Sequence, residues 1–150
     1  HSDGQPRRKM ECAPYLQAYH MTETPTTPSL PRVDLKIERR SSHPWIFQKM
    51  VEKPRDHIPP GTVVDVHDIT GNWVARAFYN GHSRISLRVL TSKQDEVVDG
   101  AFFARKIAAA VSFRRDTLKL DAVTDAYRVV FSEADDLSGL VVDRFGDTLV

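Results

Sequence analysis

Basic side chains between residues 39 and 88 are the groups in this sequence best suited to bind a ligand. They are Arg39, Arg40, His43, Arg76, Arg84 and Arg88, with aromatic residues such as Trp45 between them. Guanidinium groups bridge phosphates bidentately and stack on unpaired bases, which ammonium groups cannot do. Each arginine alone is usually a solvated charge. The set together predicts a nucleic-acid surface.

Charge is distributed unevenly along the chain. The net charge is +1, but residues 1–120 hold 19 Lys and Arg against 13 Asp and Glu, while residues 121–150 hold 2 against 7. A basic front part is typical of proteins that bind polyanions, although a surplus of this size also occurs on ordinary surfaces. The placement of the arginines must therefore decide between polyanion binding and an ordinary charged surface.

Other chemistry finds little support. Glu133, Asp135 and Asp136 form a carboxylate cluster that could bind Mg²⁺ or act as acid and base. No phosphate-cradling loop is near it, so a solvated turn is the expected structure. The histidines lack metal-ligand spacing, and P-loop, nucleophile-elbow and dinucleotide motifs are absent. We expect no catalytic, metal or cofactor-binding residue in this chain.

The elements that would position the basic residues are short strands. Alternation at Val33, Leu35 and Ile37 predicts the first strand. Further strands are predicted at residues 62–67, 73–79 and 84–90, with turn residues between them. Arg84 and Arg88 share a parity with Ser86 and should project from one face of their strand. This spacing favours a small barrel or sandwich over residues 32–91. The expected large core residues are Trp45, Phe47, Trp73, Phe78 and Tyr79.

The flanking segments differ in character. Residues 1–31 hold five of the nine prolines and no periodic pattern, which predicts a disordered tail or a cloning remnant, with Cys12 an incidental exposed thiol. A helix is predicted over about residues 100–118, with Asp99 as its N-cap and Arg114 and Arg115 near its end. A hairpin follows at residues 127–150. Its last strand is only three residues long, so we interpret the chain as the front part of a longer protein.

Four blocks carry a family resemblance. They are residues 39–47 (RRSSHPWIF), 73–80 (WVARAFYN), 85–90 (ISLRVL) and 132–147 (SEADDLSGLVVDRFGD). In order and spacing they resemble the RlmI-like family of large-subunit ribosomal RNA cytosine-C5 methyltransferases, over about residues 33–150. Ser138 stands where that family usually has proline, a small departure in a loop that affects the site assignment little.

The resemblance implies a mainly β fold with an α+β extension. A PUA-type barrel, a small β-barrel that binds RNA, would occupy residues 32–91. A helix and the truncated start of the central α/β domain would occupy residues 92–150. S-adenosylmethionine is implied for the full-length parent, whose catalytic cysteine and methyl-donor motif are not matched here.

The sequence thus predicts the RNA-binding N-terminal portion of a ribosomal RNA methyltransferase, inactive by itself. The expected partner is RNA, above all large-subunit ribosomal RNA, and a homodimer is left open. No apolar run reaches the roughly 20 residues of a membrane span, and the single cysteine favours the cytoplasm. Two alternatives remain: a stand-alone binding or protein-interaction barrel without enzymatic activity, and a complete enzyme centred on the carboxylates of residues 133–136.

Overall fold

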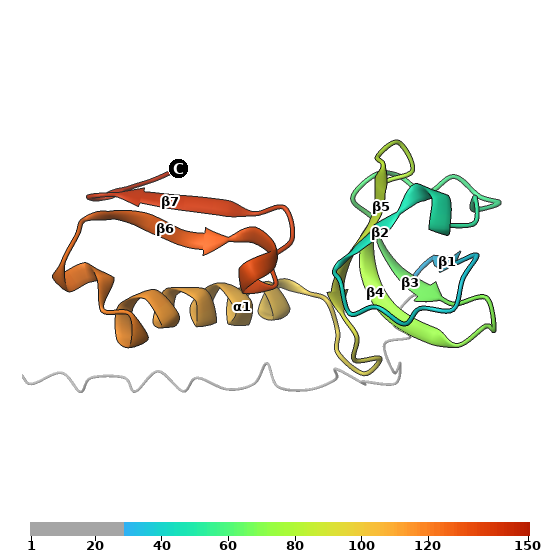
Figure 1. The fold of residues 1–150 in the computed structure, drawn as a ribbon, viewed down its shortest axis with the longest axis horizontal. Coiled ribbons are helices and arrows are strands. Elements are labelled where there is room, and N and C mark those ends of the chain that lie inside the picture. Colours follow the sequence, from blue (N-terminus) through green and yellow to red (C-terminus); the bar gives the residue numbers. More distant parts are fainter. Residues whose placement is uncertain (1–28) are drawn as a thin grey trace, which may run out of the picture.

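The computed structural model describes residues 29–150 as two sheets joined by a linker and a helix (Figure 1). The predictions for residues 1–28, including Cys12, lie outside the described residues. Within the described part, no helix is long and apolar enough to cross a membrane.

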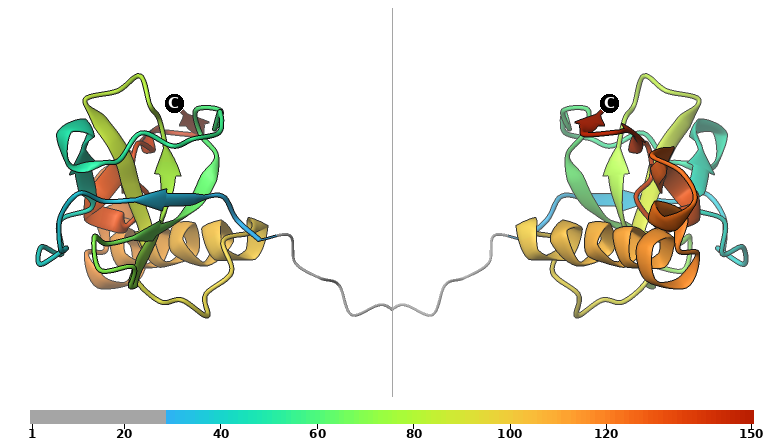
Figure 2. Two further views of the ribbon diagram at one scale, coloured as in Figure 1. Left: turned by 90° about the vertical axis from the view of Figure 1, so that its right-hand side faces the viewer. Right: turned by 90° about the vertical axis from the view of Figure 1, so that its left-hand side faces the viewer.

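The first sheet contains five strands in the order β1-β3-β4-β5-β2. Their bounds are β1 Arg32–Asp34, β2 Trp45–Phe47, β3 Val63–His67, β4 Trp73–Tyr79 and β5 Ile85–Thr91. Only the β1–β3 pair is parallel. A bridge between Leu35 and Val51 joins the two ends of the sheet, and the Lys36 amide donates to the Met50 carbonyl at 2.9 Å. The sheet is thereby closed into the predicted small barrel, whose strands curve around one interior in the end-on views (Figure 2).

The barrel core is aliphatic, which corrects the expectation of an aromatic one. Val64, Val66 and Leu87 are fully buried, together with Val33 and Leu35. Of the five aromatic residues expected in the core, only Tyr79 is buried, whereas Phe47 is 39% exposed and the other three are half-buried. A closed sheet of about 60 residues has a narrow interior, which branched side chains fill well.

The second sheet packs on the helix α1 (Gly100–Ser112). Its strands are β6 Ala126–Phe131, β7 Val141–Phe145 and β8 Thr148–Leu149, all antiparallel. The small core contains Ala110, Val130 and Leu137. Asp99 caps α1 as predicted, since its carboxylate accepts from the Phe102 amide at 2.8 Å.

The helix continues as one wider π turn at Phe113–Thr117. Arg114, expected at an exposed helix end, is instead buried there. It forms a bidentate ion pair with Asp135, the second contact at 2.8 Å. Asp135 belongs to the short 3₁₀ helix η4 (Ser132–Asp135) that precedes β7. The pair fastens this acidic loop to the end of the helix.

A row of three side chains on the outer face of the barrel meets the second unit, which consists of α1 and the second sheet. Trp45, Arg88 and Phe78 are cross-strand neighbours on β2, β5 and β4. Phe78 stacks on Phe103 of α1, with ring centroids 6.1 Å apart. Trp45 Nε1 donates to Glu133 Oε1 at 2.7 Å, and an Arg88 guanidinium nitrogen lies 3.2 Å from the same oxygen.

Glu133 is charged in this setting despite its partial burial. Burial alone would raise the pKa of its carboxyl group. Hydrogen bonds donated by Ser132, Trp45 and Ser138 outweigh that effect and lower the pKa to about 2. The carboxylate is therefore ionised at neutral pH and joins the two units.

The linker between the units is held by Arg76. Its guanidinium pairs with Asp65 at 2.9 Å and donates to the backbone carbonyls of Gln94 and Glu96, the former at 3.1 Å. The Glu96 carboxylate in turn accepts from Thr91 of β5 at 2.6 Å and from Arg105 of α1 at 3.3 Å. These contacts fix the path of the chain from the barrel to the helix.

The aliphatic core predicts contrasting effects of two substitutions. Leu87→Ala should lower the free energy of unfolding by about 2–5 kcal/mol, because it leaves a cavity at a fully buried site. Phe47→Ala should cost about 1 kcal/mol or less, because its side chain is largely exposed. Urea unfolding measures both. Equal losses of stability would place Phe47 in the core after all.

The junction predicts a pH-dependent effect of Glu133→Gln. The folded-state pKa lies below the ordinary 4.5, so the charge of Glu133 stabilises the protein above pH 4.5 and this contribution is lost as the pH falls towards 2. Glu133→Gln should cost about 1–3 kcal/mol at pH 7. The difference from the unmodified chain in urea unfolding should shrink between pH 4.5 and pH 2. Asp136→Asn, at an exposed neighbour, is the control and should change stability by about 0.5 kcal/mol or less at pH 7. A constant difference across this pH range would contradict the assignment.

Candidate nucleic-acid interface

A groove on the barrel surface gathers half of the predicted site residues. The groove, called here the Phe47 groove, has a volume of about 460 Å³. Arg39, Arg40 and His43 line it together with the rings of Trp45 and Phe47. Its base is apolar, formed by residues such as Leu35, Ile46 and Met50. Basic and aromatic groups therefore meet over one hollow, as the sequence predicted.

The loop between β1 and β2 holds these groups in place. An Arg39 guanidinium nitrogen donates to the His43 carbonyl at 2.8 Å. The Trp45 amide donates to His43 Nδ1 at 3.1 Å, and the two rings meet edge to face at 5.4 Å. Because Nδ1 accepts, Nε2 is the nitrogen of a neutral His43 that carries the proton. Burial lowers the pKa of Arg39, but an arginine remains protonated at neutral pH.

Further cations lie on the other side of Phe47. Arg84 and Lys49 line an adjoining hollow in which Phe47 is the shared wall. Arg84 is exposed and forms no side-chain hydrogen bond or ion pair with any residue in 29–150. Arg40 pairs only with the exposed Glu38 at 3.0 Å, an interaction worth little in water. An exposed ring thus stands between cations that are available to a ligand.

Arg76 and Arg88 lie elsewhere and have internal partners. Arg76 is occupied by Asp65 and two linker carbonyls, and its side chain is only 15% exposed. Arg88 pairs with Glu133 and lies 5.8 Å from the centre of the Trp45 ring. The structure therefore divides the predicted set into two groups. Arg39, Arg40, His43 and Arg84 lie around Phe47, whereas Arg76 and Arg88 hold the linker and the junction.

The expected parity on β5 is only partly observed. Arg88 and Ser86 do not both face the solvent. Ser86 is only 2% exposed, and together with Tyr79 it lines a different hollow of the barrel. Register shifts in the β2–β5 and β4–β5 pairs change which side of the sheet each β5 residue faces. Bulges of this kind alter the alternation that simple parity assumes.

The acidic loop is not the solvated turn that the sequence suggested. Glu133 and Asp135 are half-buried and joined to Trp45, Arg88 and Arg114, and only Asp136 is well exposed. No cluster of three or more potential metal ligands occurs within residues 29–150. These carboxylates therefore serve packing and orientation in the described part of the chain.

Phe47 and Lys49 were not among the predicted site residues. Trp45, Ile46 and Phe47 are consecutive apolar residues, so their pattern does not say which of them faces the core. The structure buries Ile46 and exposes Phe47. The proline before this run and the charged residues around it are the only sequence signals that favour a short surface strand.

Comparisons with known proteins agree with this geometry. Residues 36–92 match the family model described as PUA-like domain. Ribosomal RNA large subunit methyltransferase I of Erwinia tasmaniensis is 42% identical over 108 residues, 72% of this chain and 27% of that protein. The protein of the same name from Salmonella arizonae is 39% identical over 134 residues, 87% of this chain and 33% of that protein. The chain spans about a third or less of the length of these curated relatives.

Two solved structures share the fold. A candidate SAM-dependent methyltransferase from Streptococcus mutans has a TM-score of 0.60 at 12% identity, over 80% of this chain and 32% of that one. A candidate methyltransferase complexed with SAH has a TM-score of 0.59 at 13% identity, over 79% of this chain and 30% of that one. The family resemblance is confirmed: the chain contains a PUA-like domain and, along most of its length, is related to ribosomal RNA large subunit methyltransferase I.

Proposed function

We propose that this chain is the RNA-binding N-terminal portion of a methyltransferase that modifies a cytosine at C5 in large-subunit ribosomal RNA. The observation that carries the proposal is the Phe47 groove, where an exposed aromatic ring lies between Arg39 and Arg40 on one side and Arg84 on the other, on a PUA-like barrel. The names of the relatives supply the class of RNA.

Each residue of the groove has a separate role in this proposal. The Phe47 ring stacks on an unpaired base, since every base offers a π face. Arg39, Arg40 and Arg84 contact phosphates on either side of that base, and His43 Nε2 donates to a base or to the backbone. Phosphate contacts supply affinity and register without reading sequence, so the barrel alone binds weakly and with little sequence preference.

S-adenosylmethionine supplies the methyl group in the reaction of the parent. The described residues do not fit this cofactor, because the carboxylates that could meet its hydroxyl groups, Glu133 and Asp135, are already bonded to Trp45 and Arg114. We therefore assign cofactor binding to parts of the parent outside this chain. The role of the junction is to orient the barrel, and the RNA on it, relative to those parts.

Removal of two free cations tests the electrostatic part of the proposal. Arg40→Ala combined with Arg84→Ala should lower the affinity for a single-stranded RNA roughly 10-fold or more at low salt. The slope of log K against log salt should become less steep by about 0.7 for each phosphate that the protein no longer neutralises. Fluorescence anisotropy at several salt concentrations measures both. Arg115→Gln, which removes one exposed charge from the second unit, is the matched control. An unchanged slope in the double variant would refute phosphate binding by these residues.

Removal of the exposed ring separates RNA binding from general polyanion binding. Phe47→Ala should weaken the binding of single-stranded RNA by about 5–100-fold, because stacking contributes roughly 1–3 kcal/mol per base. Heparin has a similar charge density and no bases, so its affinity should be unchanged. Equal losses of affinity for both polymers would indicate a disturbed surface, and an unchanged affinity for RNA would refute stacking on Phe47. Equal affinity of the unmodified chain for RNA and heparin would favour general polyanion binding over RNA recognition.

A further inference from the structure

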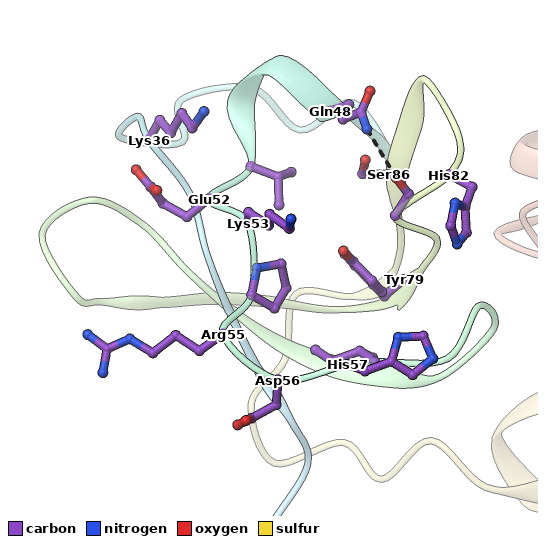
Figure 3. Close-up of a pocket in the computed structure, with 14 residues that line it drawn as sticks. Lys36, Gln48, Glu52, Lys53, Arg55, Asp56, His57, Tyr79, His82 and Ser86 are labelled. Carbon is purple, nitrogen blue, oxygen red and sulfur yellow. Dashed lines mark hydrogen bonds between the residues drawn. The ribbon is translucent and has the colours of Figure 1, made fainter.

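A second cavity opens on the barrel and shares no residue with the Phe47 groove. Its volume is about 640 Å³. The loop at residues 52–58 forms one side, and the end of β4 with the following turn forms the other (Figure 3). Gln48 Nε2, from the segment before that loop, donates to the Gly81 carbonyl of the turn at 3.0 Å. The cavity is therefore built by segments that the barrel holds in fixed positions.

The Tyr79 hydroxyl is available at the floor of this cavity. The Tyr79 side chain is buried, with 9% of the residue exposed, and its hydroxyl has no hydrogen-bond partner among residues 29–150. Within residues 29–150 only His67 Nδ1 is a fully buried side-chain polar atom without a partner, so the Tyr79 oxygen remains accessible from the cavity. Gly81 leaves room for the hydroxyl, since a Cβ at that position would lie 2.6 Å from it. The oxygen is directed into the cavity in Figure 3.

Both cationic and acidic side chains line the cavity that holds this hydroxyl. Lys36, Lys53 and Arg55 line the cavity, and none of them forms an ion pair within the described part of the chain. Glu52 and Asp56 also line it, but Asp56 is directed away from the middle in Figure 3, as is Arg55. Lys53 is directed towards the middle, on the same side as the Tyr79 hydroxyl. Lys53 is therefore the cation that faces the middle of the cavity together with that hydroxyl.

We propose that this cavity binds a nucleoside monophosphate, either free or as one residue of an RNA chain. A volume of about 640 Å³ is far larger than a single phosphate needs and lies in the usual range for small organic ligands. Val51, Pro54 and Ile58 give it an apolar wall that suits a base. The lysines suit the phosphate, and the Tyr79 hydroxyl suits a ribose or base oxygen. The inference does not depend on RNA binding at the Phe47 groove.

Titration of the isotope-labelled chain with CMP, followed by amide NMR shifts, tests the site. CMP should shift the amides of residues 79–82 and 53–57, whereas cytidine and inorganic phosphate should bind at least 5-fold more weakly. Tyr79→Phe should weaken CMP binding about 5-fold, the loss of roughly one hydrogen bond. Its melting temperature should be unchanged or higher, because the hydroxyl has no partner in the fold. Lys53→Gln should weaken CMP binding similarly, and Lys93→Gln should have no effect on it.

The remaining outcomes each decide the proposal. A short single-stranded RNA that shifts the same amides, in a manner abolished by Tyr79→Phe and retained in Phe47→Ala, would identify the ligand as a residue of RNA. Shifts with CMP alone would identify a free nucleotide. Equal binding of CMP and inorganic phosphate, stronger binding of a glutamate-rich peptide, or the absence of shifts would overturn the proposal. So would a lowered melting temperature of Tyr79→Phe, because the hydroxyl would then be structural.

Discussion

The carboxylate of Glu133 is the group on which the relative placement of the two sheets depends. It receives the indole N–H of Trp45 and the guanidinium of Arg88 from the barrel, and hydroxyl groups of Ser132 and Ser138 from its own loop. An ionised carboxylate that accepts several hydrogen bonds is held in one orientation, because each donor must approach along a lone pair of its oxygens. Apolar packing such as that of Phe78 on Phe103 stabilises the contact between the two sheets, while the hydrogen bonds to the Glu133 carboxylate define their relative orientation.

Ser138 has more importance than its position in a loop suggested. Its hydroxyl donates to Glu133 Oε1 at 2.8 Å, a hydrogen bond that a proline at this position cannot make. The sequence analysis expected this departure to affect the site assignment little and did not foresee a contact at the junction. The structure shows that the serine adds a donor to the carboxylate that joins the two sheets.

The sequence predicted elements well and contacts between them poorly. Four of the five barrel strands and the cap at Asp99 follow from local patterns that the structure confirms. The pairing of Trp45 with Glu133 spans 88 residues, and no local pattern reports it. The choice between Ile46 and Phe47 for the core depends on where β5 lies and on a register shift beside it. Such information exists only in the closed barrel, so the exposure of Phe47 could not be predicted.

The division of the arginines shows why residue type alone does not define a nucleic-acid surface. Arg76 and Arg88 carry the same group as Arg40 and Arg84, but carboxylates and carbonyls lie within their reach. Trp45 connects the two sets. Its N–H is held by Glu133 of the second unit, and its ring forms a wall of the Phe47 groove beside His43. A ligand in that groove therefore touches a side chain whose orientation the second unit controls, so binding by the barrel and orientation by the junction are coupled through one indole.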